Sequence, residues 1–353
     1  MHRAPASPAL FTERKGENGL HISHLLKRRW ASHFGLFLLL LLTACSTASP
    51  SIPTLPASVA PATVAIPTTT PLPTRIAVIE TAPAQTKPAL PTAAPTLPPT
   101  PAPTTTLAPD AWQQMPVIPT LSPRALEIYR RGLELGNNPY AFSKIGDCES
   151  TPTWFLADFD KGTRYYNLGD YTNLQPVIDY FAGSYERTSL AVKPGFTATS
   201  VMTPLWADPK QCEKDESPLA CEYRLHKPAF AIIMLGSNNT PRPERFEPQM
   251  RKILDETIAR GIVPVLVTKA DNLEGNHAIN AAIGKLAYEY DIPLWNFWLA
   301  VQPLPHHGLQ DDGAHLTWAP SQFNASMMKM AWPWRNLTAL QTLDAMMKAV
   351  QQP

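Results

Sequence analysis

Charge, glycine and metal-binding patterns are all scarce in this chain of 353 residues. Charged residues make up 17% of the chain, and no region is strongly basic. Residues 1–45 have six basic and two acidic residues, a net charge of +4. Residues 46–120 have two of each, and residues 121–353 have 22 basic and 25 acidic residues, a net charge of −3. Nucleic acid is therefore not expected as a partner. The 16 glycines exclude a collagen-like repeat and form no nucleotide-binding pattern. No Cys/His spacing matches a zinc site, so neither metal nor cofactor is expected, and three histidines are interpreted as solvated or structural: His277, His306 and His307.

The first 45 residues contain no apolar run long enough for a transmembrane helix, which needs about 20 residues. The run Phe34–Leu42 is shorter and follows the basic residues Lys27–Arg29, an order typical of a secretory signal. The ending Leu-Thr-Ala-Cys at Leu42–Cys45 resembles the lipobox of bacterial lipoproteins, in which the cysteine is lipidated and becomes the mature N-terminus. We predict a signal peptide over 1–44 and a lipid on Cys45, which would anchor the protein to the extracytoplasmic face of a bacterial membrane. An ordinary signal peptide with a chance cysteine is the alternative.

Proline, by contrast, is abundant and unevenly distributed. Residues 46–120 hold 18 of the 39 prolines, together with 16 threonines. Because proline lacks the N–H and fixes φ, such a segment cannot form a helix or a central strand. We therefore predict that residues 45–120 are a disordered stalk that lifts the folded part off the membrane, and we exclude a single globule of 353 residues.

The folded part is predicted to begin near residue 121. Ser122 and Pro123 offer an N-cap and a proline at the first helical position, and Gly136–Pro139 supplies a stop signal. The apolar residues between them recur at helical spacing. Residues 121–353 are numerous enough for one domain with a substantial core.

Short apolar runs later in the chain alternate with helical patterns. The runs are Ala229–Leu235, Ile262–Val267 and Ile292–Trp298, and the helical patterns are Phe246–Gly261 and Asn276–Tyr290. This order predicts an α/β fold, a doubly wound parallel sheet with helices on both faces. In such sheets the chemistry lies at the carboxyl ends of the strands.

Four short motifs carry the candidate chemistry, and they occur in a fixed order. Gly-Asp-Cys-Glu-Ser (146–150) follows an expected strand at Tyr140–Ile145 and is predicted to open a helix. Pro-Gly-Phe-Thr (194–197) and Gly-Ser-Asn-Asn (236–239) come next, and Asp-Gly-Ala-His (312–315) lies near the end. Together these motifs resemble the SGNH/GDSL hydrolase family.

The resemblance implies a role for each matching residue. Cys148 is the nucleophile, His315 the general base and Asp312 the residue that orients it. The N–H groups of Cys148 and Gly195 and the amide of Asn238 form the oxyanion hole. Two residues depart from the family pattern: Cys148 stands where the family has serine, and Asn239 stands where it has aspartate, which is usually structural.

The four cysteines divide into roles once the protein is taken to be exported. If Cys45 carries lipid, Cys212 and Cys221 can close a ten-residue loop as a disulfide. Cys148 then remains unpaired, either as a nucleophile or as a small buried apolar residue. We expect His315 and a helix N-terminus to lower the pKa of the Cys148 thiol. Ser150 is a second candidate nucleophile, but its position in a helical turn would point it elsewhere.

The sequence thus predicts a surface-anchored esterase that removes acyl groups, such as acetyl, from polysaccharide or other cell-surface esters. A catalytically silent binding module on the same fold and an acyltransferase remain as alternatives. Aromatic residues concentrate toward the C-terminus, most of them expected in the core, although some would be able to line a sugar-binding cleft: Trp295, Phe297, Trp298, Trp318, Trp332 and Trp334.

Overall fold

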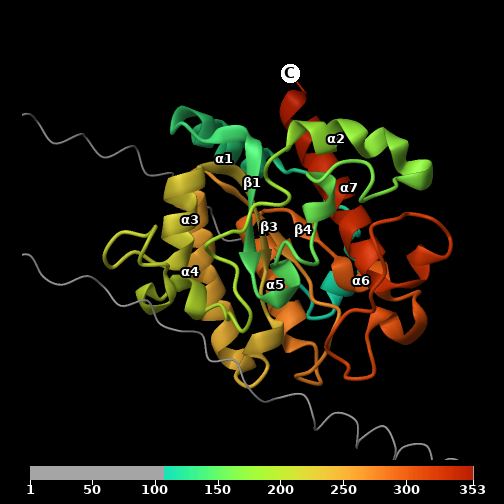
Figure 1. Ribbon diagram of the computed structural model, residues 1–353. Helices are drawn as coiled ribbons and strands as arrows, with labels where there is room; N and C mark the ends of the chain where they lie inside the picture. Colours follow the sequence, from blue (N-terminus) through green and yellow to red (C-terminus); the bar gives the residue numbers. More distant parts are fainter. Residues whose placement is uncertain (1–106, 353) are drawn as a thin grey trace, which may run out of the picture. The chain divides into compact units, whose positions relative to one another are not determined.

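The computed structural model describes residues 107–352 (Figure 1). The chain divides into two units, Met1–Thr86 and Lys87–Pro353, and every described residue belongs to the second. The predicted signal peptide, Cys45 and most of the predicted stalk lie outside the described residues. Within the described part, no helix is both long enough and apolar enough to cross a membrane.

A parallel sheet forms the centre of the described part. Its strands run in the order β1 (Asn138–Gly146), β2 (Pro228–Met234), β3 (Val263–Val267) and β4 (Leu294–Trp295). Every residue of β2 and β3 is buried, so both faces of the sheet are covered. In Figure 1, α3 and α4 lie to one side of the strands and α6 and α7 to the other. The helices are α1 (Pro123–Glu134), α2 (Gln175–Tyr180), α3 (Pro218–His226), α4 (Phe246–Ala259), α5 (Ala278–Tyr290), α6 (Phe297–Val301) and α7 (Ala331–Gln351).

The winding of the sheet reverses at β1. Gly146 pairs with Met234 of β2 on one side and forms a parallel bridge with Val192 on the other. The segment at Val192, which follows β1 in the chain, therefore lies outside β1, whereas β2 to β4 extend in the opposite direction. This is the predicted doubly wound arrangement, and a sheet of this kind places its binding site at the point of reversal. Here that point is the carboxyl ends of β1 and β2.

Most of the predicted elements are confirmed, and local contacts explain their ends. The Ser122 hydroxyl accepts a hydrogen bond from the N–H of Ala125 at 3.1 Å and so caps α1. The run Ile292–Trp298 is predicted as one strand, but the strand covers only Leu294–Trp295. The side chain of Asn296 accepts a bond from the N–H of Leu299 at 3.2 Å and turns the chain into α6.

The packed region begins upstream of the predicted boundary at residue 121. Trp112 lies in a 3-10 turn at Ala111–Gln114 and is only 1% exposed. Its indole packs edge-on against Trp298, with ring centroids 4.9 Å apart. The fully buried amide of Asn296 donates to the carbonyls of Trp112 and Met115, at 2.8 and 2.9 Å. The last residues of the predicted stalk are therefore part of the folded domain.

The cysteines of the described region pair as expected. Cys212 and Cys221 form a disulfide, which confirms the prediction, and Cys148 is free and half-buried. Cys221 lies in α3 and is fully buried, so the bridge ties the preceding loop to a helix of the core. Cys148 is thus the one described cysteine that retains a thiol.

The segment after β1 differs from the prediction. We expected an α-helix to start at Cys148, but the structure has only a 3-10 turn at Cys148–Ser150. Irregular chain and short 3-10 turns follow until α2 begins at Gln175. A turn of three residues contributes little macrodipole, so the expected helix N-terminus at the thiol is absent.

Candidate active site

Gly146 ends β1 in a position that only glycine fits. A Cβ on Gly146 would overlap the hydroxyl of Ser150 and the carbonyl of Met234. The chain therefore folds back tightly, which buries Ser150 completely and leaves its hydroxyl without a partner in the described region. Ser150 thus faces the interior and points elsewhere than Cys148, as expected, whereas Cys148 and Glu149 of the same turn are partly exposed.

Asp147 holds the two strand ends together. One carboxylate oxygen accepts from the N–H of Glu149 at 3.1 Å, and the other accepts from the amide of Asn238 at 3.1 Å. Burial raises the pKa of Asp147, against the opposing effect of the Glu149 N–H bond. This carboxyl group joins the loop after β1 to the loop after β2.

Asn238 lies at the site, but its amide is already engaged. Its second N–H donates to the carbonyl of Phe196 at 3.2 Å, so both hydrogens have acceptors. Donation to an oxyanion would require exchange of one of these bonds. The N–H groups of Cys148 and Gly195, by contrast, donate no hydrogen bond within residues 107–352. Asn239 is buried and its side chain accepts from the N–H of Ala198 at 3.2 Å, a structural role.

The thiol of Cys148 differs electrostatically from our expectation. Its pKa is raised, first by burial and then by the neighbouring carboxylates of Asp147 and Glu149. The prediction of a lowered pKa is wrong, because it relied on a helix that does not form and neglected these two acidic neighbours. The resting side chain is therefore a thiol, and any nucleophilic role requires a base to remove its proton.

The loop that carries Asp312 and His315 holds the candidate base. One oxygen of Asp312 accepts from the N–H groups of Ala314 and His315, at 2.9 and 3.0 Å. The other oxygen bonds Nδ1 of His315 at 2.6 Å. A bridge between Leu309 and Leu316 closes the loop at its base. Asp312 thus fixes both the backbone of the loop and the orientation of the imidazole.

The same contact sets the charge of His315. Its pKa is raised above the ordinary 6.5, chiefly by the bond to Asp312, whose own pKa is lowered in return. Because the neutral form is the base, His315 is competent above this raised pKa and protonated below it. We expect an NMR titration of the ring protons to give a midpoint above 6.5. Asp312→Asn lowers the midpoint toward 6.5 in the same measurement, and an unchanged midpoint would contradict the assignment.

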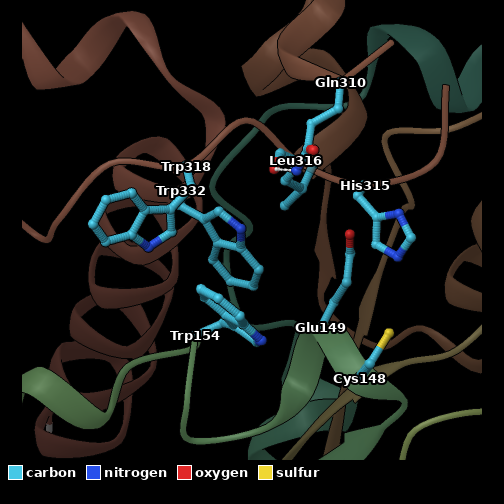
Figure 2. Close-up of a pocket in the computed structure, with 8 residues that line it drawn as sticks. All are labelled: Cys148, Glu149, Trp154, Gln310, His315, Leu316, Trp318 and Trp332. Carbon is cyan, nitrogen blue, oxygen red and sulfur yellow. Dashed lines mark hydrogen bonds between the residues drawn. The ribbon is translucent and has the colours of Figure 1, made fainter. Parts of the chain in front are cut away.

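A pocket of about 630 Å³ connects these groups. Figure 2 shows three indoles on one side of the pocket and the Cys148 thiol and the His315 ring, facing each other, on the other side. Glu149 lies between the indoles and these two groups. Among the hydrogen bonds of the described region, none joins the thiol to the imidazole. The lining residues are Cys148, Glu149, Trp154, Gln310, His315, Leu316, Trp318 and Trp332.

Glu149 lines the pocket and is paired with the buried Arg335 beneath it. Arg335 of α7 is 3% exposed and donates from Nη1 to one oxygen of Glu149 at 2.9 Å. Three rings surround the guanidinium, with centroids 5.1–5.4 Å away: Phe155, Phe297 and Trp332. Burial raises the pKa of Glu149 to about 7, although Arg335 lowers it. A carboxyl group that titrates near neutral pH thus lies beside the thiol.

Some lining residues escaped the sequence analysis, and others had been considered. Three lining residues were missed, Glu149, Trp154 and Gln310, although Glu149 is the immediate neighbour of Cys148. Arg335, the buried partner of Glu149, was missed as well. Among the C-terminal aromatics, Trp295 and Phe297 are fully buried, as expected for core residues, whereas Trp318 and Trp332 line the pocket. The histidines outside the motif lie elsewhere, as His277 packs between Trp112 and Trp298, and His306 and His307 lie in an exposed turn.

No protein-family profile matches the chain. Two curated relatives, both named "Thioesterase 1/protease 1/lysophospholipase L1" and from two strains of Escherichia coli, are 32% identical over 97 residues. That match covers 26% of this chain, and the chain spans about half (47%) of the relatives' length.

Similar solved structures include a GDSL-like lipase from Bacteroides thetaiotaomicron, at 13% identity and a TM-score of 0.37 over 62% of this chain and 98% of that one. The structure of TesA is 19% identical in sequence and has a TM-score of 0.35; the match covers 57% of this chain and 99% of TesA. A psychrotrophic esterase from a Pseudoalteromonas species is 12% identical in sequence and has a TM-score of 0.37; the match covers 60% of this chain and 100% of the esterase. The chain is therefore similar, over part of its length, to proteins named as lipases, esterases and a thioesterase.

Proposed function

We propose that the protein is an SGNH-like ester hydrolase in which Cys148 is the nucleophile, His315 the base and Asp312 the orienting carboxylate. The observation that carries this proposal is the shared pocket of Cys148 and an Asp312-paired His315, at the carboxyl ends of parallel strands. The curated relatives, whose names include a thioesterase and a lysophospholipase, support acyl-bond cleavage as the chemistry.

The reaction uses the groups as follows. His315 takes the proton from Cys148, and the sulfur attacks the ester carbonyl carbon, forming a C–S bond. The N–H groups of Cys148 and Gly195 donate to the oxyanion, and losing one such donor typically costs about 2.7–4 kcal/mol of transition-state stabilisation. The C–O bond breaks and the alcohol leaves with the proton from His315. Water then attacks the thioester, with His315 removing its proton and returning it to the sulfur, which releases the acid.

The raised pKa of Cys148 determines what His315 must contribute. A resting thiolate is disfavoured by burial and by Asp147 and Glu149, so proton transfer has to accompany the attack. The Asp312 contact that raises the pKa of His315 also stabilises the imidazolium formed in that step. The Asp312–His315 pair thus compensates for the raised pKa that Asp147 and Glu149 impose on the Cys148 thiol.

The location we propose is the extracytoplasmic face of a bacterial membrane, with a lipid on Cys45. The motif at Leu42–Cys45 and the proline-rich stretch that follows support this placement. The disulfide at Cys212–Cys221 is consistent with an oxidising compartment. Cell-surface esters, including acetyl esters of polysaccharides, would then be within reach of the domain.

The test is hydrolysis of 4-nitrophenyl acetate by the purified protein. We expect turnover that rises with pH through the titration of His315, and His315→Ala reduces it to the rate of the uncatalysed solution. No difference between the two proteins on several acyl esters would refute the hydrolase and favour a binding module. Formation of a new ester with an added alcohol acceptor, in place of free acid, would identify an acyltransferase.

A further inference from the structure

Two indoles of the pocket are exposed to water to an unusual degree. Trp318 is 58% exposed and Trp154 is 47% exposed, and both line the pocket beside Cys148. Trp154 stacks on Trp332, which is 6% exposed and holds it from behind, with ring centroids 6.3 Å apart. Exposed apolar surface of this kind next to a reactive group marks a ligand contact. Such flat faces suit a ring better than a flexible chain.

The position of His315 decides which half of an ester this pocket takes. In the proposed reaction His315 gives its proton to the leaving alcohol, so the alcohol lies on the His315 side of Cys148. His315 lines the pocket, whereas Gly195 and Asn238, next to the oxyanion, do not. The tryptophan-lined space therefore receives the alcohol half. A space of about 630 Å³ accommodates an alcohol far larger than a simple alkyl group.

Glu149 provides a polar contact within this apolar space. One of its oxygens accepts from Arg335, and the other has no hydrogen-bond partner among the described residues. Figure 2 shows the carboxyl group directed into the space between Leu316 and His315. A bound alcohol that carries further hydroxyl groups would donate one of them to this oxygen. The ion pair with Arg335 restricts the rotamer of Glu149, so the acceptor is held in place.

The charge of the pocket distinguishes a neutral alcohol from a cationic one. Three indoles and a carboxylate would also suit a quaternary ammonium group. Arg335, however, neutralises Glu149, and its guanidinium lies 5.4 Å from the centroid of the Trp332 ring. A ligand cation would therefore meet a buried positive charge behind the same aromatic wall. A neutral polyol with an apolar face avoids this repulsion.

We propose that the pocket is a sugar subsite, in which Trp318 and Trp154 stack on a pyranose ring and Glu149 accepts a hydrogen bond from one of its hydroxyls. This inference rests on the proposed ester hydrolysis and specifies its substrate: an acylated saccharide whose sugar is the leaving alcohol. Glu149 is then a specificity-determining residue rather than part of the proton transfer.

The experiment compares two kinds of substrate with the same acyl group, sugar esters and a simple alkyl ester. We measure kcat/KM for partly O-acetylated xylotetraose, mannotetraose and chitotetraose and for ethyl acetate, following acetate release. Trp318→Ala lowers the ratio of the best sugar ester to ethyl acetate about tenfold, as expected for loss of one stacking surface. At a pH well above the Glu149 pKa of about 7, Glu149→Gln lowers the same ratio about fivefold, because a charged acceptor is replaced by a neutral amide. Trp206→Ala, at a 48% exposed tryptophan outside the pocket, serves as the matched control and leaves the ratio unchanged.

A second measurement does not depend on turnover. Unacetylated forms of the same oligosaccharides are titrated into Cys148→Ala protein while tryptophan fluorescence is recorded, and Trp318→Ala in that background abolishes the change. If the oligosaccharides bind saturably to Cys148→Ala protein but the unaltered protein hydrolyses none of the esters, the sugar subsite is retained and the proposed hydrolase function is refuted. Hydrolysis with unchanged ratios and no binding of any of the three sugars would overturn the subsite alone. A higher kcat/KM for acetylcholine than for every sugar ester would also overturn it, in favour of a cation site.

Discussion

Cys148→Ala lowers kcat/KM for 4-nitrophenyl acetate by at least about 10³-fold, the scale on which nucleophiles of catalytic triads act. Cys148 is the free thiol of the described region, and Ser150, the nearest hydroxyl in its turn, is completely buried. The hydroxyl of Thr151, the next one along the chain, is engaged in a 2.8 Å bond to the carbonyl of Cys148. The measurement is initial-rate kinetics at a pH above the titration of His315, where the base is neutral.

Cys148→Ser separates a nucleophile from a residue that only shapes the turn. A serine hydroxyl has a far higher pKa than a thiol, so it relies more heavily on His315, but it forms the same kind of acyl intermediate. We expect activity between that of the native protein and that of Cys148→Ala. Mass spectrometry after rapid quenching would show one acyl group on the peptide that contains Cys148. Full activity of Cys148→Ala would rule out the acyl-enzyme and leave His315 as a base acting on water.

The proximity of the candidate motifs could be predicted because the fold converts sequence order into spatial order. Strand β1 pairs in register with β2, so the motifs that follow the two strands meet at one edge of the sheet. The hydrogen bond between Asp147 and Asn238, 91 residues apart in the sequence, is the direct result. The contact between Asp312 and His315 could be predicted from their spacing of three residues alone, since both residues lie within one loop.

The electrostatics of the site was not predictable from the same motifs. The direction of the Cys148 pKa shift depends on how deeply the turn is buried and on the absence of a following helix, which are tertiary properties. Arg335 lies 186 residues from Glu149 in the sequence, and nothing in the sequence of α7 indicates that its side chain pairs with Glu149. Pairing of charges across a fold is fixed by packing, so residue type alone cannot assign it.

A chain that starts at residue 121 is expected to be much less stable than one that starts at residue 107. Deleting the segment removes the 1% exposed indole of Trp112 from its place against α5, and truncation of a buried tryptophan costs about 3–5 kcal/mol. Gly284 of α5 shows how close this contact is, because a Cβ at that position would overlap the Cβ of Trp112. The free energy of unfolding is measured by urea denaturation.

The deletion is expected to lower the free energy of unfolding more than Trp112→Ala does, because it also removes hydrogen-bond partners of the fully buried Asn296. The side-chain amide of Asn296 donates to the carbonyls of Trp112 and Met115, and its N–H donates to the carbonyl of Val117 at 3.1 Å. Each buried donor left without an acceptor costs about 1–3 kcal/mol. Trp112→Ala keeps all three carbonyls and serves as the comparison, and Trp206→Ala, at an exposed site, is expected to change stability little. Equal stability of the chains starting at 107 and 121 would show that Asn296 finds other partners. A loss larger than that of Trp112→Ala places the start of the folding unit within the predicted stalk, because Asn296 also turns the chain from β4 into α6.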